Sequence, residues 1–190
     1  MRKTTTSPTQ ALFESLRQLY RDSGQLLLDC DRIMGEKGWE SISGGVWAES
    51  SSLAAVSDKW FPRWVFRFYM PLKPDEELED FIDTLKFISA HFTSDGDTYV
   101  DDPLIVSGNI TYIEPLKRGE IFRGYQSYSY YLCKSWFWNN KERTFGSWHS
   151  HKPEKYYKDI IDKIDTFALK LYDISSSDAL EDMVVNRLFD

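Results

Sequence analysis

Residues 8–34 place an apolar side chain at every third or fourth position, which is the spacing of one face of an α-helix. Ser7 before Pro8 is a typical helix start, because a hydroxyl caps the first turn and proline suits the first helical position. Gly35 or Gly38 ends the pattern. The helix would be roughly 40 Å long, so we expect it to cross the domain diagonally or to form a homodimer through part of its apolar face. That face carries Leu12, Leu16, Leu19, Tyr20, Leu26, Leu27, Cys30, Ile33 and Met34.

Two later segments show the same spacing and also predict helices. Residues 74–92 begin with an acidic turn, which the helix dipole favours, and residues 152–171 begin with a lysine and a proline. A short last helix is expected from Asp178 to Phe189. The apolar positions are Leu78, Phe81, Ile82, Leu85, Ile88 and Phe92 in the first segment, and Tyr156, Ile160, Ile161, Ile164, Phe167 and Leu171 in the second.

Alternation with a period of two predicts the strands. Residues 104–113 and 60–70 are the clear cases, and residues 45–56 form a weaker one. Residues 125–138 and 143–149 flank an asparagine-rich turn and predict an aromatic hairpin. In the strand at 60–70, one face carries Trp64, Phe66, Phe68 and Met70.

These elements predict an α+β protein with a mostly antiparallel, five-stranded sheet packed with helices. The element order is α-ββ-α-βββ-α-α, and residues 7–190 form a single domain after a flexible tail at residues 1–6. This order resembles that of the profilin, roadblock and GAF sandwich folds. The resemblance concerns element order alone, and it implies binding of protein partners or small ligands.

Composition and charge narrow the classes of function. Aromatic residues make up 16% of the 190 residues, the net charge is −7 and the pI is about 5.0. A negative chain is not expected to bind nucleic acid or anionic membranes, and no apolar run is long enough to cross a membrane. Cys30 and Cys133 form no CxxC motif, so both thiols are expected to be reduced and buried in a cytoplasmic protein.

Two groups of residues are candidates for chemistry. His149 and His151 lie two apart on a predicted strand, so both point to one side and could share a metal ion. The alternative is that they lie half-exposed at a strand end. The second group combines cations, an aromatic ring and small side chains that leave room for an anionic ligand: Arg63, Arg67, Tyr69, Arg123, Ser127, Ser129 and Tyr131. The alternative is that these arginines pair with the acidic second helix, predicted at residues 74–92, and that the serines allow close helix packing.

No GxSxG, Walker, GxGxxG or HExxH motif occurs in the chain. We therefore expect a non-catalytic, cytoplasmic binding or scaffold domain without a cofactor, whose partner is a protein or a small molecule. One alternative is a metal-dependent hydrolase or nucleic-acid-processing enzyme that uses His149, His151 and an acid from elsewhere. Another is an acidic antagonist of a basic protein, with the predicted helix at 74–92 and the loop at 93–102 that follows it as its surface.

Overall fold

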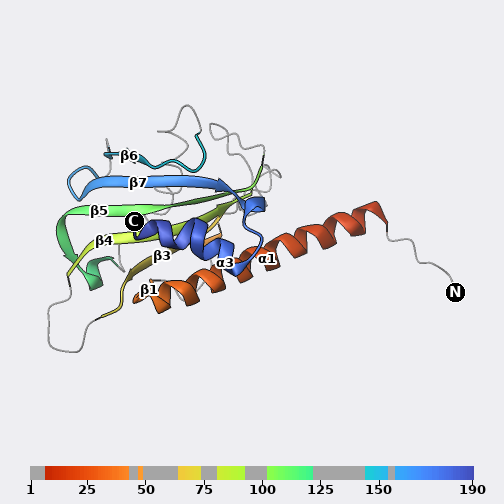
Figure 1. Cartoon of the computed structure of the whole chain (residues 1–190), viewed down its shortest axis with the longest axis horizontal. Coiled ribbons are helices and arrows are strands. Elements are labelled where there is room, and N and C mark those ends of the chain that lie inside the picture. The colour runs from red at the N-terminus through yellow and green to blue at the C-terminus, as the bar shows by residue number, and fades with distance from the viewer. Residues whose placement is uncertain are drawn as a thin grey trace, which may run out of the picture.

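A computed structural model of the chain describes residues 7–42, 47–48, 64–73, 81–92, 102–121, 144–153 and 157–190. An antiparallel sheet forms the centre of the molecule, and helices cover one of its faces (Figure 1). The strand order is β1-β3-β4-β5-β7-β6. β2 pairs with the first part of β3, and β1 pairs with its last part. The strands are β1 (Trp39–Ser41), β2 (Trp47–Ala48), β3 (Trp64–Pro71), β4 (Phe81–His91), β5 (Leu104–Lys117), β6 (His149–His151) and β7 (Ile161–Lys170).

The predicted α+β class and the antiparallel sheet are confirmed, as is the first helix. α1 runs from Pro8 to Glu36, and the Ser7 hydroxyl accepts a hydrogen bond from the Gln10 N–H at 3.2 Å. The helix ends before Gly38, whose φ of +79° reverses the chain into β1 at little steric cost.

The helix predicted at residues 74–92 is wrong over residues 81–91, which form β4. Both faces of this strand are buried along most of its length, so polar residues do not alternate with apolar ones. A register shift between Ile82 and Thr84 also brings Ile82 and Leu85, three residues apart, into the same core cluster. A bulged strand buried on both faces therefore produces the spacing of a helix face.

The helix predicted at residues 152–171 is wrong for the same reason, because residues 161–170 form β7. The register against β5 shifts where Thr111 opposes Lys163 and Tyr112 opposes Ile161. Ile161 and Ile164 consequently share a core cluster despite a separation of three residues. The described residues contain seven strands rather than five, so the predicted element order, and the resemblance to profilin, roadblock and GAF folds that depended on it, do not hold.

Most of the predicted aromatic hairpin lies outside the described residues, which resume at Thr144. The strand predicted at 143–149 is wrong over residues 144–148, which form no strand. Phe145 and Gly146 form a turn in which Gly146 has a φ of +74°, and β6 begins only at His149. β6 pairs with β7, with His149 opposite Thr166 and His151 opposite Ile164. Of the weak strand predicted at 45–56, only the two residues of β2 are described.

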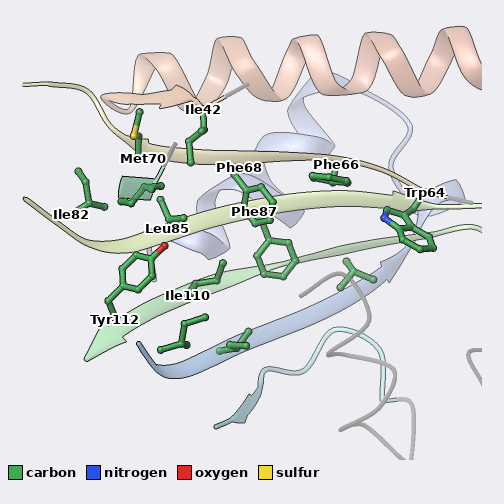
Figure 2. Close-up of a cluster of buried hydrophobic side chains, with 14 of the residues drawn as sticks. Ile42, Trp64, Phe66, Phe68, Met70, Ile82, Leu85, Phe87, Ile110 and Tyr112 are labelled. Carbon is green, nitrogen blue, oxygen red and sulfur yellow. The ribbon is translucent and has the colours of Figure 1, made fainter. Parts of the chain in front are cut away.

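The two faces of the sheet carry separate cores. The predicted apolar face of β3 is confirmed, since Trp64, Phe66, Phe68 and Met70 all join one cluster with residues of β4, β5 and β7 (Figure 2). On the opposite face, Tyr69 and Ile88 pack against the second half of α1 and the C-terminal segment. That segment consists of the helical turns η2 (Leu171–Asp173), α3 (Ser177–Leu180), η3 (Glu181–Val185) and η4 (Asn186–Leu188).

Candidate protein-docking site

Among the described residues, the fully buried positions of α1 all lie in its second half, and Tyr20 just before it meets the Phe92 ring edge-on at 5.8 Å. The fully buried positions are Ser23, Leu27, Cys30, Ile33 and Met34. The first half extends past the sheet, as Figure 1 shows for the red end of the helix. The side chains of Leu12 and Phe13 are 65% and 58% exposed there. The apolar face of α1 is thus continuous, but it lacks cover from the described residues over its first three turns.

A groove follows this uncovered face and leads under the C-terminal segment. Its outer part, about 460 Å³, lies along Leu12, Leu16 and Leu19. Its inner part, about 450 Å³, lies between α1 and the residues that connect β7 to α3. Both parts include Leu19, Asp22 and Tyr172, so we treat them as one feature and call it the α1 groove. Leu26, Leu171, Ile174 and Leu180 complete its apolar floor.

The inner wall of the α1 groove is fixed to the helix by polar contacts. The Ser177 hydroxyl donates to the Asp29 carboxylate at 3.0 Å, and Ser176 caps α3 by accepting from the Ala179 N–H. Tyr172 projects beside the groove and is 70% exposed. An aromatic ring held on a fixed wall next to exposed leucines is typical of protein-binding surfaces.

The rim of the groove is acidic. Asp22 accepts a hydrogen bond from the Gln18 amide at 2.7 Å, and Asp29 accepts one from the Gln25 amide at 3.1 Å. Neither carboxylate forms an ion pair with any residue that the structure describes. An apolar floor with an uncompensated acidic rim suits an amphipathic segment that carries positive charge along its edge.

Buried polar contacts hold α1 in the orientation that exposes its first half. The Arg67 guanidinium forms an ion pair with Asp31 at 3.1 Å, and the Tyr69 hydroxyl donates to the other oxygen of the same carboxylate at 3.0 Å. Burial raises the pKa of Tyr69 well above its ordinary value and also raises that of the Cys30 thiol. These groups stay protonated near neutral pH, so the tyrosine remains a donor to Asp31.

Two of the predicted ligand-binding residues are therefore adjacent, and they contact α1. Arg67 and Tyr69 lie on the same face of β3, as the alternation indicated. Arg67 pairs with an acidic residue of the first helix, Asp31. The other members of the predicted set, Arg63, Arg123, Ser127, Ser129 and Tyr131, lie outside the described residues. A ligand site that combines all of them stays a prediction.

The two histidines lie at one edge of the sheet, on β6. His149 approaches the Thr144 carbonyl at 3.4 Å, and burial lowers the pKa of His151. Among the described residues, no three His, Cys, Asp or Glu side chains are grouped so that they could hold a metal ion. Glu154, a carboxylate close in sequence, is not among those residues. The predicted metal site stays a prediction that rests on two ligands.

The sequence did not indicate two buried polar clusters, one around His91 and one around Lys86. The Ser89 hydroxyl and the His91 Nε2 atom are 3.0 Å apart on β4, with Trp64 stacked on the imidazole. Both residues are almost fully buried, so this serine and histidine do not form an accessible nucleophile and base. Correct assignment of β4 as a strand would have revealed the pair, because residues two apart on a strand share a face.

The second missed group surrounds Lys86, which is only 6% exposed. Its ammonium group donates to the Leu188 carbonyl and lies 4.7 Å from the Trp39 ring centre and 4.4 Å from that of Phe189. The Asn109 side-chain oxygen is 3.3 Å away. Burial lowers the pKa of Lys86 to about 8. The lysine thus joins the end of the chain to the sheet.

Comparison with known proteins gives no further assignment: no family model, curated protein or solved structure matches this chain. None of the helices in the described residues is both long and apolar enough to cross a membrane. The α1 groove is consequently the feature from which function has to be argued.

Proposed function

We propose that the chain is a non-catalytic, cytoplasmic protein-binding domain and that the α1 groove is its binding surface. The observation that carries this proposal is the exposure of Leu12 and Phe13 on an apolar helix face that continues directly into the core. Exposed apolar residues are ordinary when they are scattered. Here they adjoin one another and a groove, which is typical of an interaction site.

The shape of the groove favours a helical partner. A helix laid along α1 would contact Leu12, Leu16 and Leu19, which lie one above another at helical spacing, and would meet Tyr172 at its end. This is the helix-in-groove mode of recognition, in which anchors recur every three or four residues. The acidic rim favours a partner segment with basic residues beside its apolar stripe.

Site-specific crosslinking tests this proposal. We would replace Phe13 by the photoreactive residue p-benzoylphenylalanine and irradiate cells that produce the full chain. We expect a crosslinked adduct, because a bound partner would lie within reach of this ring. The matched control places the same residue at Leu28, which is 57% exposed on the same helix and does not line the α1 groove.

A second variant links the adduct to the groove. Addition of Leu12→Asp should reduce the adduct at Phe13 about tenfold or more, because a buried leucine contributes roughly 2 kcal/mol to association. Leu12 is mostly exposed in the isolated chain, so circular dichroism and the melting temperature should be unchanged. Equal adducts at Phe13 and Leu28, or none at either position, would contradict the proposed surface.

A further inference from the structure

The anchoring of α1 begins at one point along the helix. The fully buried positions start at Ser23, and the hydrogen bonds and the ion pair that fix α1 to the described chain reach Asp29 and Asp31, further along. Residues 8–22, which we call the arm, include no buried residue and extend past the sheet (Figure 1). The position of the arm therefore depends mainly on the stiffness of the helix where the arm joins the anchored part.

A ring contact joins the arm to the end of β4. Tyr20 meets Phe92, the residue after β4, edge-on, and the ring centres lie 5.8 Å apart. Both residues are only partly buried. A contact between two partly exposed rings is weak in comparison with the apolar core that holds the second half of α1. It favours one position of the arm but does not lock it.

Gly24 directly follows the first buried position of α1. Glycine inside a helix is less stable than alanine, because its backbone has more freedom to lose on folding. Some helical glycines are explained by close packing against a neighbour. At Gly24, however, an added methyl group would meet nothing within 4 Å. The structure thus gives no packing reason for this glycine, and what it supplies at the start of the anchored part is backbone freedom.

Ser23 weakens the helix at the same point. Its hydroxyl donates to the Leu19 carbonyl at 2.7 Å, which is the carbonyl that accepts the Ser23 main-chain N–H in a regular α-helix. A serine bonded in this way often bends a helix, because its hydroxyl competes for the carbonyl one turn back. If the main-chain bond lengthens, the side chain keeps the carbonyl satisfied. A bend here therefore leaves no buried polar group without a partner.

From these observations we propose that Ser23 and Gly24 form a hinge, about which the arm moves as a rigid helix. Hinges are a few positions, often small residues, that absorb a change in backbone torsions. Movement away from the position that the structure shows costs the contact between Tyr20 and Phe92. The sheet and its two cores stay unchanged.

The hinge makes the width of the α1 groove adjustable. Leu19 lines the groove from the arm, whereas Tyr172 lines it from the opposite wall. The hydrogen bond from Ser177 to Asp29 fastens that wall to the anchored part of α1. Movement of the arm therefore changes the gap between Leu19 and Tyr172, so the groove opens and closes while its wall stays in place.

Distances between two spin labels, measured on the isolated chain by double electron–electron resonance, test the hinge. One label replaces Glu14 on the arm and the other replaces Asp182 on the C-terminal segment, and both positions are exposed. Attachment through p-acetylphenylalanine leaves the native cysteines unaltered. We expect a broad distribution of distances in the original chain. Gly24→Ala should narrow it to about half the original width, because alanine restricts the backbone at the hinge.

Gly35→Ala is the matched control. Gly35 also lies within α1, and a methyl group added there also meets nothing within 4 Å. It lies beyond the anchoring contacts, so the substitution raises helix propensity equally but should leave the width of the distribution unchanged. A narrow distribution in the original chain, or equal narrowing by the two substitutions, would overturn the inference.

A second pair of labels separates bending from unfolding of the arm. Labels in place of Gln10 and Arg21 both lie on the arm, roughly 16 Å apart along the axis. They should give a narrow distribution with and without Gly24→Ala, because the arm moves as one helix. A broad distribution for this pair would show that the arm unfolds, and it would also overturn the hinge. Neither measurement involves a partner, so the hinge and the proposed function can fail separately.

Discussion

Lys86 shows how a single buried charge depends on its surroundings. Its ammonium group has lost most of its contact with water, which lowers its pKa to about 8, and it contacts the Leu188 carbonyl, the Asn109 side-chain oxygen and two aromatic rings. In the unfolded chain the same group has its ordinary pKa near 10.5. Between these two values the unfolded state binds more protons than the folded state. Stability attributable to Lys86 should therefore rise with pH across this window.

A pH series of urea unfolding checks this prediction. The difference in unfolding free energy between the original chain and Lys86→Met should shift in favour of the original chain as the pH rises from 8 to 10.5. Using the difference is essential, because Tyr69 and Cys30 have raised pKa values and their contributions are lost at high pH in both chains. A difference that stays constant with pH would show that the lysine is not desolvated.

Two glycines are expected to respond in opposite ways to the same substitution. At Gly108 on β5, an added methyl group would meet the main-chain carbonyl of Asp165 on β7 and the ring of Phe87. Gly108→Ala should therefore destabilise the protein by about 2 kcal/mol. At Gly24, inside α1, nothing lies within 4 Å of the added group. Gly24→Ala should stabilise the protein by roughly 0.5–1 kcal/mol. Chemical denaturation of both variants measures the two effects, and equal signs would contradict the packing around Gly108.

At the scale of elements, the attachment of α1 depends on Asp31. The ion pair with Arg67 is largely buried, whereas the pair between Arg32 and Glu36 on the same helix is more than half exposed at both side chains. Removal of Asp31 takes away the carboxylate that both the Arg67 guanidinium and the Tyr69 hydroxyl contact, and loss of one member of a buried pair is costly. Exposed pairs contribute little.

We expect Asp31→Ala to lower the unfolding free energy by about 3 kcal/mol and Glu36→Ala to lower it by less than about 0.5 kcal/mol. Urea denaturation followed by circular dichroism gives both values. The larger loss should also be accompanied by increased hydrogen exchange in the second half of α1. Similar losses in the two variants would show that Asp31 does not anchor the helix.

The sequence pattern identified α1 and β3 for different reasons. The second half of α1 has one covered and one solvated side. β3 is buried on both faces, but it pairs with β4 without a register shift and carries large apolar residues on alternate positions, so its pattern was also clear. β4 and β7 were assigned as helices because each is covered on both faces and contains a register shift. Spacings such as that between Ile161 and Ile164 then match a helix, and only pairing with neighbouring strands decides the matter.

At the scale of the whole molecule, one side of the candidate site, the apolar face of α1, was predictable from the sequence, and the other side was not. The sequence indicated a long apolar stripe on α1 and a pairing role for it. The inner wall of the α1 groove was not predictable, because Tyr172 and Ile174 follow a segment, residues 152–171, that was predicted to be a helix. Their position beside α1 follows from β7 being a strand that ends at Lys170.

The division of α1 into an anchored and an uncovered half has a consequence for the cost of recognition. A free peptide of about 15 residues is barely helical in water, because formation of the first turn fixes several backbone torsions in return for one hydrogen bond. In this protein the anchored half supplies that first turn permanently. α1 is accordingly helical from Pro8 onward, so a partner that bound the uncovered half would meet a preformed helix and would not have to offset the cost of nucleating one.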